Sequence, residues 1–485
     1  MINDKQFLIG DKPTSLSGWN NITLVNNKIL SYQPKLNVLI NDEHSVVILG
    51  YAWNVLPDVK TPEDAIREWN SETTRNEIFE TENYWCGRYV LVVGNALYLD
   101  TSGSLGVFYG GTDISSSMNV ICQHQNKKIV IPNIQHRVDP DYVPGGKTMN
   151  QGINRLLPSQ VLDIVTCSVE NRPLLPSGII TENSIESQID RLAESYVYSL
   201  KNMANHFKGY TIQLALTGGR DSRAVLALIE RSGVKYETFT AEHDNLQDGD
   251  RYIPKKLAKI LNRPYRFIRR NKKLWSQQKY DDYHQHTSGY AVDEDWLFYS
   301  YGQYQQLNRS KTEKTLILRS AIWEIPNSYL RKYYDGKCFD LYKIYPGMLL
   351  NPILKESGDK WLKMVNNDKF NNEISKINRL MWEFRNGCWT SSIEQSFDMM
   401  DNIESIQTCN NRYFLSILLG FDAELSHKKK HEELLVSRVC PQIGNIIYDD
   451  QGTSAPYWIC KKRNLEKSYN QIKRKVKKCI KRIIF

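Results

Sequence analysis

The sequence predicts an α+β domain followed by an α/β domain with a parallel sheet and a largely helical C-terminal part. Short runs of alternating apolar and polar residues, separated by turn residues, fill the first third of the chain and indicate antiparallel strands. From residue 188 onward, strand and helix patterns alternate with short connections, which is typical of a parallel sheet covered by helices. A stretch rich in Pro, Gly and Ser separates the two patterns and indicates a linker.

The first domain is expected to span residues 1–172. Its strands are predicted at 46–49, 88–93, 96–100, 106–109, 120–122 and 128–131. A helix is predicted at 62–70, where Thr61 is a suitable N-cap. The turn residues Gly94-Asn95 and Gly110-Gly111 favour short connections between antiparallel strands.

The linker is expected at 173–187 and the second domain at 188–460. The predicted order in the second domain is helix 188–207, strand 210–216, helix 223–231, strand 236–240, helix 251–261 and strand 265–269. Gly233 is expected to end the helix at 223–231, because glycine adopts the left-handed conformation at little cost. Sheets of this kind bind ligands at the carboxyl ends of their strands. The remainder of the domain is predicted to be mainly helical.

Charge and composition limit the classes of partner. The formal net charge of +9 arises in the segment 461–485, where eleven Lys and Arg stand against one Glu, so the main body is not expected to bind nucleic acid. This segment is predicted to be a basic amphipathic helix that either lies on an anionic membrane surface or docks on the second domain. The nine cysteines are scattered, and no signal peptide or membrane-spanning stretch is visible. We therefore expect a cytoplasmic protein, peripheral to a membrane if the tail binds one.

The run from Leu214 to Arg223 points most directly to chemistry. An apolar strand leads into Gly218 and Gly219, and a helix-forming stretch begins after Ser222. Glycines let the backbone approach a ligand closely, and the N–H groups at a helix start bind anions. Asp221 suits a phosphate site if a magnesium ion lies between its carboxylate and the phosphates. A Walker-type loop is excluded, because its glycine spacing is longer and a lysine precedes its serine.

This loop and several further motifs resemble those of a known family. The segment 217–222 resembles the Ser-Gly-Gly-x-Asp-Ser pyrophosphate-binding loop of the ATP pyrophosphatases, with Thr217 in the first Ser position. Motifs similar to those of the glutaminase domain of asparagine synthetases are Gly87-Arg88-Tyr89-Val90, the run 98–109, the run 115–118 and Gly152-Ile153-Asn154-Arg155-Leu156-Leu157-Pro158. The chain thus resembles the asparagine synthetase-like family. The resemblance implies an Ntn-hydrolase-like sandwich first and an adenine nucleotide α hydrolase-like synthetase domain second.

The same resemblance implies ATP and Mg²⁺ as cofactors and assigns the site residues. The residues assigned to the nucleotide are Leu216, Thr217, Gly218, Gly219, Asp221, Ser222, Phe239 and Thr240, the last two beside the adenine. Asp221 and Glu324 are assigned to the metal. Trp323 takes the place of the family's aspartate and is expected to face the loop. The residues assigned to catalysis are Asp221, Glu324, Arg220 and Arg223, where the arginines would steady the charge of the leaving pyrophosphate.

The substrate is assigned to Glu383, Arg385 and Arg412, which match a Glu-x-Arg and an Asn-x-Arg pattern in a subgroup of the family. An ion pair that only stabilises the fold explains Glu383 and Arg385 equally well. Asp248 and Asp250 either lie near the nucleotide or cap a helix. The lysine run 428–430 is expected on the solvated surface, although it also offers a cation for the pyrophosphate.

These residues predict an ATP-dependent ligase that forms an amide bond. It would adenylate a carboxylate of a small molecule or glycan, release pyrophosphate and pass the acyl group to ammonia or an amine. An asparagine synthetase proper that uses ammonia is an alternative. A non-catalytic scaffold that binds a nucleotide is another.

Hydrolysis of glutamine is not expected. The family's nucleophile is an N-terminal cysteine whose own α-amine acts as the base. This chain begins Met1-Ile2-Asn3, and its first cysteine is Cys86. The purified protein should therefore release no ammonia from glutamine. Ammonia release above that of a heat-denatured sample would contradict this prediction.

Overall fold

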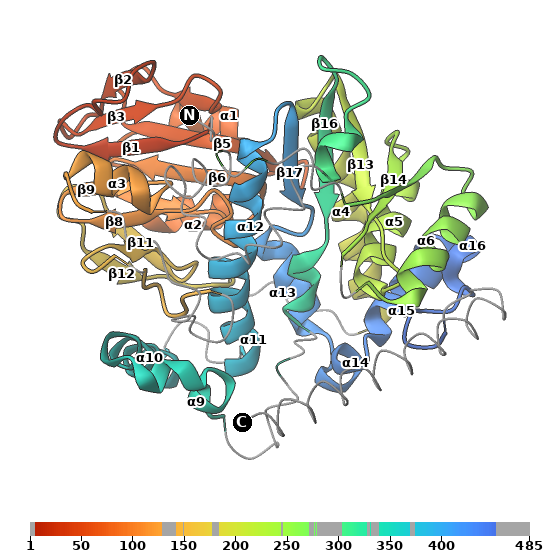
Figure 1. Cartoon of the computed structure of the whole chain (residues 1–485). Coiled ribbons are helices and arrows are strands. Elements are labelled where there is room, and N and C mark those ends of the chain that lie inside the picture. The colour runs from red at the N-terminus through yellow and green to blue at the C-terminus, as the bar shows by residue number, and fades with distance from the viewer. Residues whose placement is uncertain are drawn as a thin grey trace, which may run out of the picture.

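The computed structural model describes residues 5–128, 142–148, 150–176, 184–243, 246–270, 276, 278, 303–326, 330, 339–368 and 374–452. These residues form two antiparallel sheets and one parallel sheet, with a helical region toward the C-terminus (Figure 1). Most of the strand predicted at 128–131, the middle of the linker and the whole basic tail at 461–485 lie outside the described residues.

Two six-stranded antiparallel sheets make up the N-terminal part. The first has the order β10 (Asn154–Arg155), β8 (Phe108–Gly110), β9 (Asp113–Ser115), β1 (Phe7–Gly10), β3 (Ile29–Tyr32) and β2 (Asn20–Thr23). The second has the order β12 (Val169–Asn171), β11 (Gln160–Asp163), β7 (Ala96–Leu99), β6 (Trp85–Val93), β5 (Val46–Asn54) and β4 (Val38–Ile40). The two sheets share one hydrophobic core and therefore pack face to face.

The alternation along β5 explains how this sandwich is layered. Val47 and Leu49 point into the core between the sheets, whereas Val46 and Ile48 point outward. The outer side chains pack with residues of α1 (Pro62–Glu68) and α2 (Arg75–Glu82). The predicted N-cap of α1 is confirmed, because Thr61 and Asp64 form a capping box.

The strand predicted at 120–122 is wrong. These residues belong to helix α3 (Met118–His124), in which Ser117 is the N-cap and accepts a hydrogen bond from the backbone N–H of Asn119. The side chains from Met118 to Cys122 are all buried. A short apolar run has no periodicity that separates a buried helix from a buried strand.

The parallel sheet has the order β15 (Tyr265–Ile268), β14 (Glu237–Ala241), β13 (Tyr210–Ala215), β16 (Lys314–Arg319) and β17 (Ile403–Gln407). The helices predicted between the first strands are α4 (Ile185–His206), α5 (Arg220–Ser232) and α6 (Asp248–Ile260). Their order confirms the predicted α/β pattern, and Gly233 ends α5 in the left-handed conformation as predicted. Strand β17 was not predicted, because it is a short, wholly buried strand among helical segments.

Helices cover both faces of this sheet. One face packs on α4, α5 and α6, and the other packs on α12 (Ser391–Ser396) and the 3₁₀ turn η9 (Phe397–Met399). The other described helices of the C-terminal half are α9 (Leu341–Ile344), α10 (Pro352–Asn366), α11 (Lys376–Leu380), the π-helix η8 (Met381–Thr390), α13 (Arg412–Gly420), α14 (Ala423–His427), α15 (Lys430–Val439) and α16 (Pro441–Gly444). Within the described part of the chain, no helix is long and apolar enough to cross a membrane.

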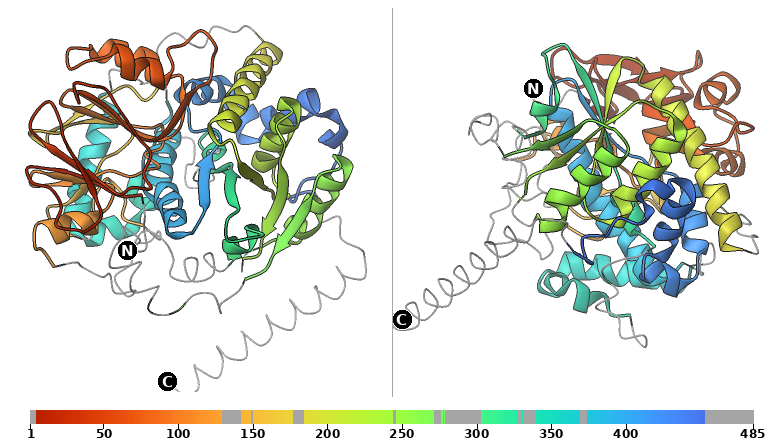
Figure 2. Two further views of the ribbon diagram at one scale, coloured as in Figure 1. Left: turned by 90° about the horizontal axis from the view of Figure 1, so that it is seen from above. Right: turned by 90° about the vertical axis from the view of Figure 1, so that its right-hand side faces the viewer.

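Buried polar contacts join the sandwich to the segment from η8 to α13, which lies between the two kinds of sheet in Figures 1 and 2. Arg88 of β6 donates two hydrogen bonds of 2.6 Å to the carboxylate of Asp398, and each side chain is only 4–5% exposed. Asn410 Nδ2 donates to the backbone oxygen of Gly87 at 2.6 Å and to Asp100 Oδ1 at 2.9 Å. Such bidentate and charge-assisted contacts fix the orientation of the joined parts.

Replacing Arg88 should destabilise the protein strongly. An Arg88→Met variant leaves the Asp398 carboxylate buried, with Lys5 as its remaining cation at 3.7 Å. We expect the free energy of unfolding in urea to fall by about 3 kcal/mol. The control is Arg67→Met, because Arg67 pairs with Asp64 on the surface, and its loss should cost less than about 1 kcal/mol. Equal effects of the two variants would contradict a structural role for the buried pair.

Candidate functional site

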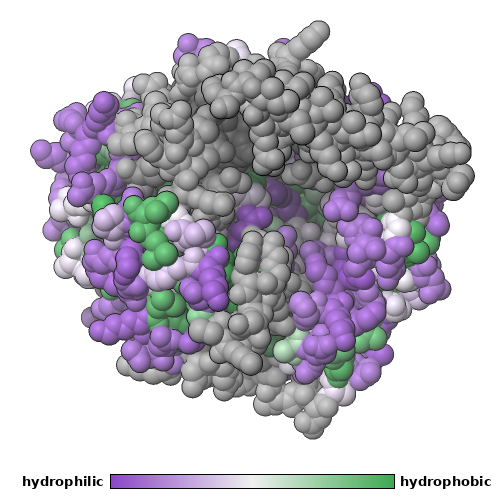
Figure 3. Space-filling model, turned by 60° about the horizontal axis from the view of Figure 1, so that its bottom comes forward, coloured by the Kyte–Doolittle hydropathy of each residue, from purple (hydrophilic) through white to green (hydrophobic). Residues whose placement is uncertain are grey.

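The strand order places a ligand crevice between β13 and β16. Strands β14 and β15 continue the sheet beyond β13, and β17 continues it beyond β16. The chain thus adds strands in opposite directions from β13 and from β16. In an open parallel sheet, ligands usually bind in the crevice at the carboxyl ends of two such strands. The loop 217–219 follows β13, and the 3₁₀ turn η5 (Ala321–Glu324) follows β16. On the face shown in Figure 3 the molecule is hollowed near the middle, and the described residues visible there are largely hydrophilic.

Hydrogen bonds within the loop hold its shape. The backbone N–H of Thr217 donates to Ser222 Oγ at 3.1 Å, and the two side-chain hydroxyls are 3.0 Å apart. The backbone N–H of Gly219 donates to Thr217 Oγ1 at 3.2 Å. Gly219 is the N-cap residue of α5 and offers no side chain of its own. The start of α5 therefore lies at the crevice, where its N–H groups favour an anion.

Two aspartates from distant parts of the chain contact Gly218 of this loop. Its backbone N–H donates to Asp250 Oδ1 at 2.7 Å, and its carbonyl oxygen accepts from the backbone N–H of Asp449 at 3.2 Å. Asp250 also accepts a hydrogen bond from the backbone of Gln247 in a capping box of α6. The carboxylate of Asp250 thus both caps a helix and contacts the loop.

Asp221 is paired with a lysine. Lys429 Nζ lies 2.9 Å from Asp221 Oδ1 and 3.2 Å from Oδ2. Burial alone would lower the pKa of Lys429, but the carboxylates of Asp221, Glu432 and Glu324 raise it above its ordinary value. The lysine is therefore charged at neutral pH. Its backbone lies in the left-handed region (φ 55°), which is unusual for a residue other than glycine.

Glu324 completes the charged group at the crevice. Burial raises the pKa of its carboxyl, and the nearby Asp221 raises it further. Arg385, Lys429 and Arg319 act in the opposite direction and favour the ionised form. The two carboxylates assigned to the metal are therefore close enough to influence each other, as the strand order requires.

Trp323 does not face the loop, and that expectation is wrong. Its side chain is fully buried in the main hydrophobic core, and its indole N–H donates to the hydroxyl of Tyr196 at 3.3 Å. Phe239 is also fully buried, and its carbonyl oxygen accepts from the backbone N–H of Leu216. The hydroxyl of Thr240 donates to the carbonyl oxygen of Leu216 at 2.8 Å. The end of β14 thus braces the start of the loop.

The arginines that flank the loop are engaged by a segment near the end of the described chain. Arg220 Nε donates to Glu433 Oε1 at 2.8 Å, and its Nη1 donates to Asp450 Oδ2 at 2.9 Å. Arg223 is fully buried, and its Nη2 donates to the carbonyl oxygen of Ile447 at 2.8 Å. A catalytic role for either arginine stays a prediction.

The structure brings one of the three residues assigned to the substrate to the crevice. Arg385 lies near Glu324 and stacks on the ring of Trp389 at 3.2 Å. Glu383 Oε2 accepts hydrogen bonds from Trp361 at 2.5 Å and from Arg379 at 3.3 Å, which is the structural pairing considered as an alternative.

Arg412 serves the junction between the sandwich and the helical region. It donates to the carbonyl oxygens of Leu174 at 2.8 Å and Pro158 at 3.1 Å, and its Nε lies 3.6 Å from Glu82. These contacts show that the guanidinium of Arg412 holds neighbouring segments together. Binding of the substrate by Arg412 stays a prediction.

A magnesium ion fits the donor set only together with a nucleotide. No group of three or more His, Cys, Asp or Glu side chains in the described part of the chain could hold a metal ion. Mg²⁺ usually takes one or two carboxylates and completes its coordination with phosphates and water. Asp221 and Glu324 supply such a pair, but Lys429 competes for Asp221.

Sequence reasoning missed Tyr448 and Asp449, and it gave Lys429 only as one of several candidate cations. Lys429 was expected on the surface because the run 428–430 has the composition of a solvated patch. Nothing local in the sequence distinguishes its middle lysine, which reaches the loop through the left-handed turn before α15. Cys86, the first cysteine of the chain, is fully buried, and burial raises its pKa to about 12.

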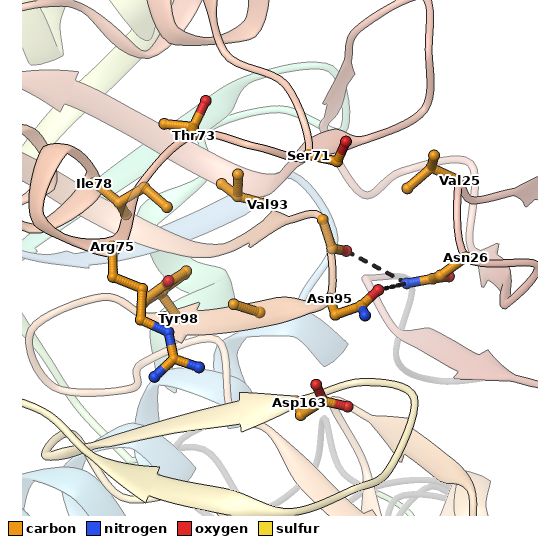
Figure 4. Close-up of a pocket in the computed structure, with 12 residues that line it drawn as sticks. Val25, Asn26, Ser71, Thr73, Arg75, Ile78, Val93, Asn95, Tyr98 and Asp163 are labelled. Atoms are coloured by element: carbon orange, nitrogen blue, oxygen red, sulfur yellow. Dashed lines mark hydrogen bonds between the residues drawn. The ribbon is translucent and has the colours of Figure 1, made fainter.

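Two cavities lie elsewhere in the described structure. One of about 410 Å³ opens on the sandwich, where Asn26 donates to Asn95 Oδ1 at 3.1 Å (Figure 4). Its Arg75 is paired with Glu170. The other, of about 300 Å³, adjoins α10, and there Lys147 donates to Asn154 at 2.8 Å. Arg75 and Lys147 in these cavities thus already have partners, whereas an open anion site would need a cation that is available to the ligand.

Comparisons with known proteins add little to this geometry. No protein-family model and no curated protein matches the sequence. NMN synthetase from Francisella tularensis is similar at 17% identity over 30% of this chain and 58% of its own, with a TM-score of 0.19. The chain thus spans less than two thirds of that protein's length. An NH₃-dependent NAD synthetase from Campylobacter jejuni is similar at 16% identity over 44% of this chain and 96% of its own, with a TM-score of 0.22. TM-scores this low do not establish a shared fold.

The raised pKa of Glu324 predicts that its carboxyl makes the folded protein less stable at neutral pH. When folding raises the pKa of a carboxyl, the folded protein becomes less stable as the pH rises from the pKa of the unfolded state to the pKa of the folded state. A Glu324→Gln variant has no such loss, so it should unfold at a higher temperature than the wild type at pH 7.5. The difference should vanish below about pH 4, where both side chains are neutral. Melting curves across this pH range test the prediction, and a less stable variant at pH 7.5 would refute it.

Proposed function

We propose that the protein is an ATP-dependent carbon–nitrogen ligase of the asparagine synthetase-like type. It would adenylate a substrate carboxylate in the crevice between β13 and β16 and transfer the acyl group to ammonia or an amine. The observation that supports this proposal is the arrangement of Asp221 and Glu324. They follow the two strands that flank the crevice, beside a glycine loop at the start of a helix.

The chemistry would proceed in two displacements. An oxygen of the substrate carboxylate attacks the α-phosphorus of ATP, the bond from that phosphorus to the bridging oxygen breaks, and pyrophosphate leaves. The lone pair of the nitrogen nucleophile then attacks the acyl carbon, AMP leaves with the electrons of the C–O bond, and the nitrogen loses a proton. The loop 217–222 would hold the β- and γ-phosphates, so that the enzyme contributes mainly position and charge.

Charged side chains at the crevice suit this scheme. Asp221 and Glu324 would hold Mg²⁺, which neutralises charge on the phosphates when it is bound. Lys429 forms an ion pair with Asp221, and the charge of Arg385 favours the ionised form of Glu324. Both cations would supply positive charge to the leaving group. Arg220 and Arg223 act mainly on the segment that covers the loop.

Glutamine hydrolysis is not part of the proposal. Cys86 is fully buried, and a pKa of about 12 leaves its thiol protonated at neutral pH. Its Sγ donates to the carbonyl oxygen of Thr408 at 3.7 Å, across the junction with β17. We infer that the first domain supports the synthetase domain and that the nitrogen comes from free ammonia or an amine.

One observation favours a non-catalytic alternative. Asp221 is already neutralised by Lys429, so the crevice has a stable charge balance without a metal. A protein with this balance could bind a nucleotide as a scaffold.

Release of pyrophosphate from ATP separates the two functions. With a panel of small carboxylates, the ligase should release pyrophosphate in the presence of its substrate. Asp221→Ala should lower this rate about 100-fold or more, because the charged contact with the metal–phosphate group is lost. Asp58→Ala is the matched control, since Asp58 is an exposed aspartate of the sandwich. No pyrophosphate with any carboxylate, together with no change of ATP binding in Asp221→Ala, would instead favour the scaffold.

A further inference from the structure

A short segment of the C-terminal region lies against the phosphate-binding loop. It comprises residues 446–450, and we call it the strap. The strap follows α16, which contacts α6 and lies beside it in Figure 1. The strap touches the starts of α5 and α6, which follow the carboxyl ends of β13 and β14.

Two arginines of α5 hold the strap through hydrogen bonds and through stacking on an aromatic ring. Arg223 donates to the carbonyl oxygens of Ile446 at 2.5 Å and Ile447 at 2.8 Å. The ring of Tyr448 lies 3.7 Å from the guanidinium of Arg223 and 4.3 Å from that of Arg220. Such stacking is favourable when the cation is desolvated, and Arg223 is fully buried.

Asp449 of the strap fits against two glycines. A Cβ atom on Gly218 would lie 3.0 Å from the Cβ of Asp449, and a Cβ on Gly249 would lie 2.7 Å from it. Both positions therefore need glycine for the strap to approach this closely. The glycines come from different helix starts, so the fit depends on the fold and not on one local motif.

The docked strap places a carboxylate against the loop. The N–H of Gly218 donates to Asp250 of α6, and the strap itself contacts only the carbonyl oxygen of Gly218, through the backbone of Asp449. Asp449 Oδ2 would lie 3.8 Å from a Cβ on Gly219. Burial and the neighbouring Asp250 raise the pKa of Asp449, so its negative charge is held unfavourably. A phosphate on this side of the loop would meet both carboxylates, and like charges at short distance repel.

We propose that the strap is an intramolecular competitor of the nucleotide at the loop 217–222. This inference rests on the proposed function, because it assumes that the loop binds ATP. With the strap docked, the side chain of Asp449 lies against Gly218 and Gly219, where its carboxylate repels the phosphates. Nucleotide binding draws Arg220 from Asp450 toward the phosphates and releases the strap, so the two states exclude each other.

Removal of the Tyr448 ring tests this competition. Tyr448→Ala should lower the Kd of the full-length protein for ATP with Mg²⁺ about fivefold, because a larger fraction of molecules has the strap undocked. Tyr448→Phe keeps the stacked ring and should bind ATP like the wild type. Calorimetry without any carboxylate substrate measures both values. Unchanged or weaker binding by Tyr448→Ala would overturn the competition.

Hydrogen exchange of the wild type gives a readout that needs no variant. Backbone amides of residues 446–450 should exchange faster when ATP and Mg²⁺ are added. Slower exchange would mean that the strap closes over the nucleotide and would overturn the inference. If neither the wild type nor Tyr448→Ala binds ATP, the proposed function itself fails. If ATP binds to the wild type and is lost in Asp221→Ala, but the strap does not respond, only the strap inference fails.

Discussion

The parallel pairing of β13 with β16 is the constraint on which the site depends. The pairing runs from Tyr210 opposite Lys314 to Leu214 opposite Leu318, so both strands deliver their carboxyl ends to one edge of the sheet. The loop after β13 and the turn after β16 must then face each other. The sheet continues from β13 to β14 on one side and from β16 to β17 on the other, so the connections that follow β13 and β16 diverge, which is the arrangement that opens a crevice in such a sheet.

Charge balance in the crevice is achieved at a cost to the fold. Lys429 reaches Asp221 from a left-handed backbone conformation, which costs about 1 kcal/mol for a residue with a Cβ atom. Burial and the neighbouring Asp221 raise the pKa of Glu324, so the ionised form of its carboxyl is held unfavourably. Proteins retain such unfavourable features where the side chains have a function other than stabilising the fold. The same reasoning applies to Asp449, whose carboxylate lies close to that of Asp250.

Buried side chains of the sandwich contact the helical region. Arg88, Asp100 and Arg155 each make at least one hydrogen bond to the helical region, and Arg155 donates to Ser392 at 2.7 Å. Because these contacts are buried, they resist relative movement of the two parts. The π-helix η8, which carries Arg385, also contacts the sandwich, because the indole N–H of Trp382 donates to the carbonyl oxygen of Thr101 at 2.6 Å.

Local signals in the sequence determined the loop, the alternation of strand and helix around it, the capping box of Thr61 and the end of α5 at Gly233. These features depend on neighbours within a few residues, and so the chain displays them directly. Only the tertiary structure decided that Trp323 enters the core, that Lys429 pairs with Asp221 and that Asp449 covers Gly218. The last two contacts join residues more than 200 positions apart, and a single sequence carries no record of which distant charges meet when the core closes.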